Sequence, residues 1–117
     1  MHCLRLAFGN VKERAELLRH KYSCSDSLTF AEPYFEKKET IEIEIIPDFC
    51  NNRNIDEIDF LSIDTNGYEL RVLEGAKDFL DNRKVGLIEV QVGMNPRNPK
   101  KVPLEKIRDF LEAKGYF

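Results

Sequence analysis

An apolar run that ends abruptly in a polar turn is the feature that most constrains this fold. Residues 58–63 (IDFLSI) are almost continuously apolar, which is typical of a strand covered on both faces. The run stops at residues 64–67 (DTNG), and apolar side chains then recur at helical spacing over residues 68–80, which predicts a helix. Residues 85–92 (VGLIEVQV) predict the next strand. This alternation predicts the α/β class, with helices packed on a mostly parallel sheet.

The two ends of the chain extend this prediction. Pro103 lies where a last helix can begin, and Gly115 suits the end of that helix. Residues 4–8 are a short apolar run that predicts a strand, whereas residues 12–20 fit a helix or a strand equally well. Residues 41–46 (IEIEII) alternate strictly, which predicts a strand with isoleucines on one face and carboxylates on the other. We expect this N-terminal part to be antiparallel or irregular.

Composition excludes several classes of function. The 117 residues fit one domain, and a formal net charge of -3 is not that of a nucleic-acid-binding protein. No apolar stretch approaches the ~20 residues that span a bilayer, and the first residues are too polar for a signal peptide, so we predict a cytoplasmic protein. Cys3, Cys24 and Cys50 are far apart and form no Cys-x-x-Cys pair, which predicts reduced cysteines and no metal site.

The polar turn after the first predicted strand is the best candidate for chemistry. Ligands of open α/β sheets bind beyond the carboxyl ends of strands, and Asp64 lies at such an end. A structural interpretation competes, because Asn66 followed by Glu69 resembles a helix capping box. Glu89 alternates with apolar neighbours inside a predicted strand, so it is either a site carboxylate or a solvent-facing glutamate. Asn95 is either a site amide or a turn residue.

The segment IDFLSIDTNGYELRVLEGAKDFL (residues 58–80) resembles a characteristic segment of FkbM-family methyltransferases. Shorter stretches resemble the same family in the right order: LAFGN (6–10), SDSL (25–28), IEIEIIPDF (41–49), LIEVQV (87–92) and FLEAKGYF (110–117). The resemblance therefore covers nearly the whole chain. It implies a Rossmann-like methyltransferase fold that uses S-adenosylmethionine to methylate a sugar or another hydroxyl acceptor.

The resemblance also assigns roles to residues. It implies three catalytic residues: Asp64, Glu69 and Glu89. It implies that four residues contact S-adenosylmethionine: Phe8, Gly9, Asn10 and Asp64. The residues expected to contact the methyl acceptor, a small molecule or glycan, are Asn66, Gly67 and Asn95. No metal ligand is expected.

The sequence departs from the family in ways that leave a second function open. Ser62 stands where the family often has lysine, and Asn66 stands where it has glutamate or glutamine. The family's first strand carries a glycine loop (V-G-A-N-x-G) that this sequence lacks, so we expect residues 1–117 to form a single, incomplete C-terminal portion of the domain. The alternative function is a non-catalytic α/β interaction module or pseudoenzyme, which self-associates through an exposed sheet edge.

Overall fold

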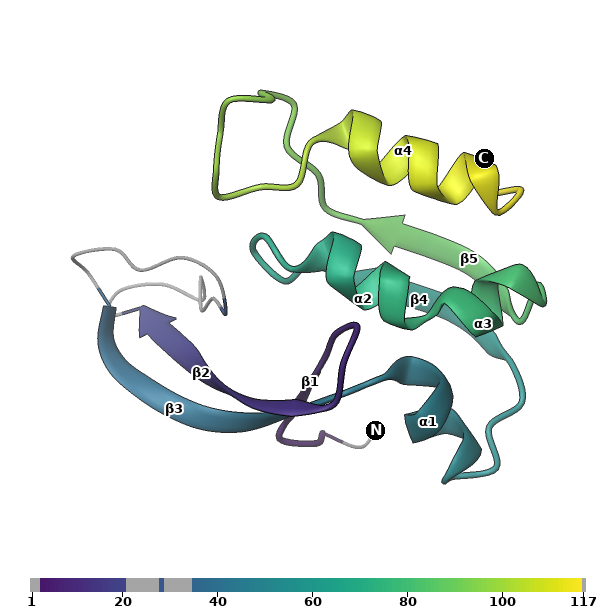
Figure 1. Cartoon of the computed structure of the whole chain (residues 1–117), viewed down its shortest axis with the longest axis horizontal. Coiled ribbons are helices and arrows are strands. Elements are labelled where there is room, and N and C mark those ends of the chain that lie inside the picture. The colour runs from purple at the N-terminus through teal and green to yellow at the C-terminus, as the bar shows by residue number, and fades with distance from the viewer. Residues whose placement is uncertain (1–2, 21–27, 29–34, 117) are drawn as a thin grey trace.

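The computed structural model describes residues 3–20, 28 and 35–116 (Figure 1). Strands and helices follow in the order β1 (Leu6–Phe8), β2 (Glu13–His20), β3 (Phe35–Glu44), α1 (Ile46–Asn51), β4 (Ile58–Ile63), α2 (Glu69–Gly75), α3 (Lys77–Asp81), β5 (Val85–Val90) and α4 (Leu104–Ala113). The described strands form two separate sheets, β1-β3-β2 and β4-β5, where the sequence had led us to expect one. The chain is thus a mixed α/β fold, as predicted.

The N-terminal sheet is mixed. β1 runs parallel to β3, and β2 runs antiparallel to it, so the ambiguous residues 12–20 form mainly a strand. Arg14 of β2 lies opposite Glu42 of β3, and their charged groups are 3.7 Å apart. Ile41 and Ile43 are buried while Glu42 is exposed, which confirms the predicted alternation along β3.

A short helix that the sequence did not predict follows β3 at once. We expected the strand to run to Ile46 and to end at Pro47, but β3 ends at Glu44. Pro47 instead lies in the first turn of α1, where its missing N–H leaves no hydrogen bond unmade. Phe49 of α1 packs edge-on against Phe8 of β1, with ring centroids 5.2 Å apart. α1 therefore anchors the N-terminal sheet to the rest of the core.

The second sheet consists of β4 and β5, which are parallel as predicted. The single helix expected over residues 68–80 is instead two short helices, α2 and α3, separated at Ala76. A Cβ atom at Gly75 would overlap the carbonyl oxygen of Gly9, so the backbone of the loop after β1 lies directly against the end of α2. Glycine is a weak helix former, which favours a break at this contact.

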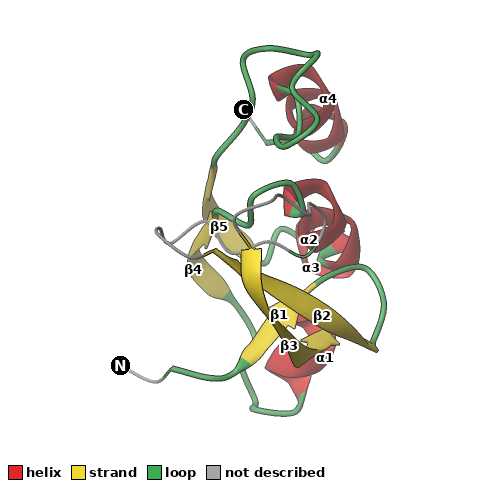
Figure 2. Ribbon diagram, turned by 90° about the vertical axis from the view of Figure 1, so that its left-hand side faces the viewer, coloured by secondary structure: helices red, strands yellow, loops and turns green. Residues whose placement is uncertain are grey.

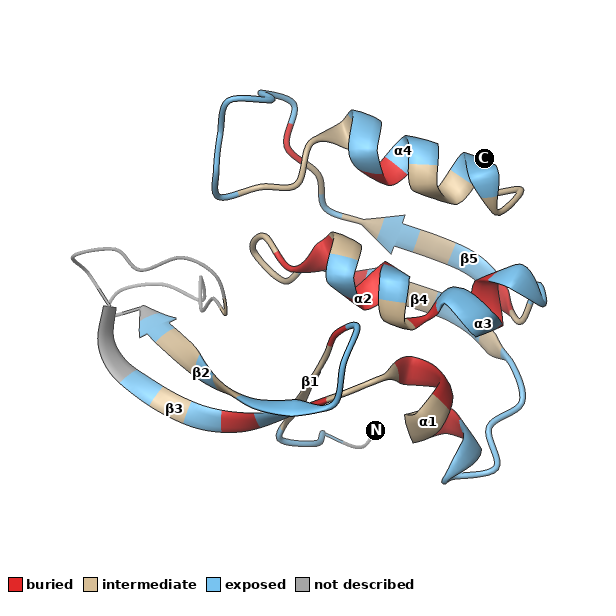
Figure 3. Cartoon of the chain, in the orientation of Figure 1, coloured by how far each residue is buried: buried red, intermediate tan, exposed pale blue. Residues whose placement is uncertain are grey.

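The described helices α2, α3 and α4 lie on one side of β4 and β5 (Figure 2). Among the helices, buried positions concentrate in α1, α2 and α3 (Figure 3). One apolar cluster joins the helices to both sheets and includes Ile43, Ile63, Leu73 and Ile107. The expectation that residues 58–63 are covered on both faces is wrong for the described residues. Phe60, on the other face of β4, is 53% exposed.

That other face carries alternate residues of both strands. Phe60 pairs with Leu87 and Ser62 pairs with Glu89, and all four are exposed. We call these four residues the open face. It is apolar toward the start of the strands and polar toward their carboxyl ends.

Candidate functional site

The residues that follow β4 form a polar loop at the carboxyl end of the parallel pair. We call residues 64–67 the strand-end loop. Asp64 is exposed, and no hydrogen bond or ion pair engages its carboxylate within the described part of the chain. Because side chains alternate along a strand, this position continues the face of Ser62. An unpaired carboxylate at a parallel strand end can bind a cation or accept a proton from a ligand.

Glu69 fixes the shape of this loop from beneath. Its side chain is fully buried, with 0% exposure. Its Oε1 atom accepts hydrogen bonds from the backbone N–H of Thr65 at 3.0 Å and of Gly67 at 3.3 Å, and its Oε2 atom accepts from Gly67 at 3.0 Å. With its oxygens turned to the backbone, Glu69 positions the loop and presents no carboxylate to a ligand.

The capping-box interpretation is wrong for Asn66, although Glu69 does bond back to backbone N–H groups ahead of the helix, those of Thr65 and Gly67. α2 begins at Glu69, its cap residue is Tyr68, and no side chain caps it. Asn66 has a positive φ of 52°, and its Oδ1 atom accepts a hydrogen bond from Lys101 Nζ at 3.1 Å. The amide therefore connects the strand-end loop to a distant segment of the chain.

Lys101 joins the ends of both strands. Its Nζ atom also donates to Oε1 of Gln91, the residue that follows β5. The loop that carries it is closed at its base by two backbone hydrogen bonds, Gly93 N to Val102 O at 2.8 Å and Leu104 N to Gly93 O at 3.0 Å. Neither Lys101 nor Gln91 is among the site residues predicted from the sequence. The strand was predicted to end at Val92, whereas β5 ends at Val90. With the observed end, Gln91 would have been a candidate for the same reason as Asp64, because it directly follows a parallel strand.

Glu89 and Asn95, two further predicted site residues, make their hydrogen bonds outside the strand-end loop. Glu89 lies on the open face, where its Oε1 atom accepts a hydrogen bond from Ser62 Oγ at 2.9 Å. Asn95 lies in the loop after β5, where its Oδ1 atom accepts from the Arg97 N–H at 3.0 Å. That contact is typical of a turn residue.

Three of the residues expected to contact S-adenosylmethionine, Phe8, Gly9 and Asn10, make contacts within the protein. Phe8 is half-buried against Phe49, and Gly9 is buried beside the Tyr68 ring. Asn10 is exposed, and its amide nitrogen donates to Glu74 Oε2 at 3.0 Å. Of the three, Asn10 presents the most surface to a ligand.

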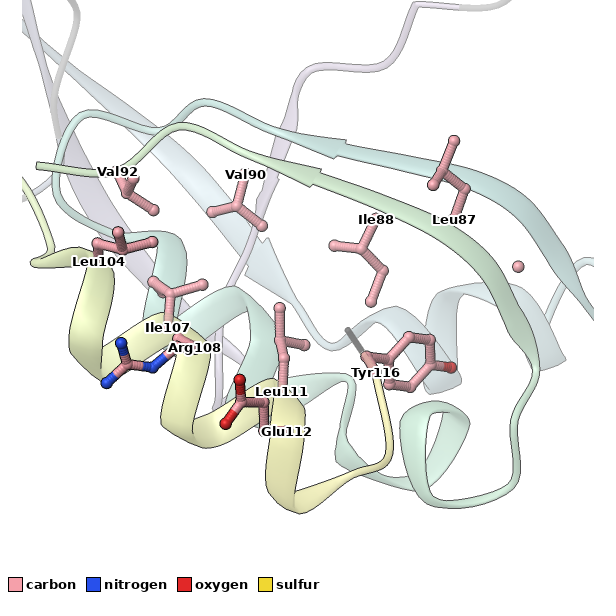
Figure 4. A pocket seen from close by; sticks show the side chains of 11 residues that line it. Leu87, Ile88, Val90, Val92, Leu104, Ile107, Arg108, Leu111, Glu112 and Tyr116 are labelled. Atoms are coloured by element: carbon pink, nitrogen blue, oxygen red, sulfur yellow. The ribbon is translucent and has the colours of Figure 1, made fainter.

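A separate groove of about 290 Å³ lies between β5 and α4 (Figure 4). Its walls are mostly apolar, with Ile88 and Val90 on one side and Ile107 and Leu111 on the other. None of the predicted site residues lines it. The groove belongs to the packing of α4 on the sheet and not to the polar site.

Together, these features describe an α/β domain with a polar site at the carboxyl ends of two parallel strands. The chain belongs to the FkbM methyltransferase family: it matches the methyltransferase FkbM domain over residues 4–117. No curated protein and no solved structure matches it.

Two observations test whether this site fits S-adenosylmethionine. The carboxylate of Asp64, which is exposed and has no hydrogen-bond or ion-pair partner among the described residues, fits the positive charge of a sulfonium. The Oγ1 atom of Thr65 is buried without a hydrogen-bond partner in the described residues, which fits a ligand that brings donors to this loop. The residues at the end of β4 therefore fit the charged end of the cofactor. Within the described residues, no cluster of metal-ligating side chains was found, and no helix has the length and apolar character to cross a bilayer.

Proposed function

We propose that this protein is an S-adenosylmethionine-dependent methyltransferase that acts on a hydroxyl oxygen of a sugar or another small molecule, within a Rossmann-like arrangement of strands. One observation carries the proposal. In a chain of the FkbM methyltransferase family, the carboxylate of Asp64 is exposed at the end of β4 and has no partner in the part of the chain that the structure describes, and a buried glutamate holds its loop. This is where an α/β sheet binds its ligand.

S-adenosylmethionine, when bound, supplies an electrophilic methyl group. Asp64 has two roles in this proposal: it attracts the sulfonium, and one of its oxygens orients or accepts the proton of the acceptor hydroxyl. Glu69 acts as a positioning residue, because its three hydrogen bonds to backbone N–H groups fix the loop that carries Asp64. Fixed geometry matters for this reaction, since the acceptor oxygen must be held in line with the methyl group at contact distance.

The remaining predicted residues have narrower roles. We assign contact with the nucleoside to Phe8 and Asn10, because Gly9 is buried. Glu89 is a second carboxylate near the same strand ends, and its hydrogen bond to Ser62 sets its orientation. Asn66 holds the acceptor side of the loop through Lys101.

A transfer assay with methyl-labelled S-adenosylmethionine and a panel of hydroxyl acceptors tests the function. Asp64→Asn keeps the size of the side chain but removes its charge and basicity. We expect it to lower turnover by at least about 100-fold, the usual contribution of a positioned acid or base. Asp59→Asn is the matched control, since Asp59 is an exposed acid of the same strand, away from its carboxyl end. Equal turnover for the two variants would contradict the role of Asp64.

Association without catalysis is a second candidate function, and the open face favours it. Phe60 is 53% exposed and Leu87 is 62% exposed, and the two pair in register on adjacent strands. The occupant in this case is a second copy of the chain, which would cover the two apolar side chains. Sedimentation velocity at rising protein concentration should then detect a dimer that Phe60→Ser weakens. A monomer at all concentrations would contradict this candidate.

A further inference from the structure

A polar cleft of about 390 Å³ opens beside the strand-end loop. Gly67 of that loop lines it, together with residues of α2, the loop after β5 and the start of α4. Asp64 itself does not line the cleft, but Gly67 of the same strand-end loop does, so the cleft and the site proposed for methyl transfer share that loop. A group bound in it would belong to the part of the acceptor that does not react.

Basic side chains outnumber acidic ones in the lining of this cleft, which we call the cationic cleft. Arg71, Lys101 and Lys106 line it, against one carboxylate, Glu74. That carboxylate already accepts a hydrogen bond from Asn10 at 3.0 Å. The cleft therefore carries an excess of positive charge that its own acid does not balance.

The basic groups also keep donors available. Lys106 has no ion-pair partner within the described part of the chain. The Arg71 guanidinium lies 5.0 Å from the centre of the Tyr68 ring, a contact that leaves its N–H groups free to point elsewhere. Lys101 donates to Asn66 and Gln91, which uses two of the three N–H bonds of its ammonium group.

We propose that the cationic cleft binds an anionic group of the methyl acceptor, a carboxylate or a phosphate, and so selects acidic acceptors over neutral ones. The assignment to the acceptor rests on the proposed methyltransferase function, whereas anion binding itself does not. Guanidinium and ammonium groups form short, charge-assisted hydrogen bonds with both kinds of anion. A neutral sugar of the same size would leave these cations without a partner.

Titration of the isotopically labelled full chain, followed by NMR, tests the cleft without any methyl transfer. The probes are inorganic phosphate, glucuronate and, as a neutral control, glucose, at constant ionic strength. We expect saturable shifts of the Gly67 amide and of the amides of residues 97, 98 and 100–102 with at least one of the two anions, and none with glucose. The anion that saturates at the lower concentration identifies the chemical group.

Substitutions distinguish a specific anion-binding site from nonspecific electrostatic attraction. Lys106→Met should weaken anion binding by about tenfold, the effect of losing one charge-assisted hydrogen bond. Lys101→Met should weaken it as well, although it also releases the strand-end loop. Lys77→Met is the matched control, because Lys77 is an exposed lysine of α3 that does not line the cleft. No saturable shift with either anion, or equal weakening by Lys77→Met, would overturn the proposal.

The two proposals fail in different ways. Saturable anion binding by a chain that transfers no methyl group would support the cleft and contradict the methyltransferase function. Methyl transfer to neutral acceptors, without anion binding, would support the function and overturn the cleft.

Discussion

Replacing Glu69 with glutamine should destabilise the protein strongly, because this buried carboxylate accepts all its hydrogen bonds from the backbone. It is fully buried, and it binds the N–H groups of Thr65 and Gly67. Glutamine has the same shape but only one oxygen, so its amide nitrogen must face one of these donors. Losing the charge and the 3.0 Å hydrogen bond at Oε2, and turning an amide N–H toward the Gly67 N–H in its place, costs about 3 kcal/mol.

Urea denaturation followed by circular dichroism measures this cost. With an m value of about 1.5 kcal/mol/M, a loss of about 3 kcal/mol lowers the unfolding midpoint by about 2 M. Glu74→Gln is the matched control, since Glu74 is an exposed glutamate of the same helix, and its replacement should stay within about 0.5 kcal/mol of wild type. If both variants unfold at the same midpoint, Glu69 does not hold the loop as described.

Two other regions give predictions of their own. Gly75→Ala would place a methyl group on the Gly9 carbonyl oxygen, so it should cost at least about 1 kcal/mol although alanine is the better helix former; thermal melting that shows a gain in stability would contradict this contact. Burial raises the pKa of the Cys50 thiol above its usual value, partly offset by the charge of Arg53. At pH 8 a smaller fraction of Cys50 is therefore thiolate, and alkylation followed by peptide mass spectrometry should modify exposed Cys3 much faster; equal rates would contradict the burial of Cys50.

Local patterns were enough to predict much of the fold. The strands over residues 41–46, 58–63 and 85–92 follow from alternation and from short apolar runs, and the structure has a strand in each region. The end of the last helix at Gly115 was also predicted, and its φ of 83° is the left-handed conformation that glycine adopts most easily.

Features that depend on distant contacts could not be predicted. Residues 12–20 carry no decisive periodicity, and pairing with β3 makes most of them a strand. The helix expected over residues 68–80 is interrupted beside Gly75, where the backbone of the loop after β1 contacts it. The exposure of Phe60 has the same origin, because an apolar run does not tell which of its faces a helix will cover.

The same distinction between local patterns and distant contacts applies to the residues of the candidate site. Asp64 and Glu69 were found because a strand end and a helix start are visible in the sequence. Lys101 was missed, since it reaches Asn66 across 35 positions and only the folded loop after β5 brings them together. The family resemblance implied a catalytic role for Glu69, whereas we propose a positioning role because its side chain is fully buried.

Calorimetric titration of the purified chain with S-adenosylmethionine, and with S-adenosylhomocysteine for comparison, tests the central claim most directly. The claim is that the strand-end loop with Asp64 forms a cofactor site. It predicts saturable binding of both ligands. It also predicts that Asp64→Asn loses more affinity for the positively charged S-adenosylmethionine than for S-adenosylhomocysteine, whose sulfide is uncharged. A folded chain that binds neither ligand, or an Asp64→Asn variant that binds both as the wild type does, would contradict it.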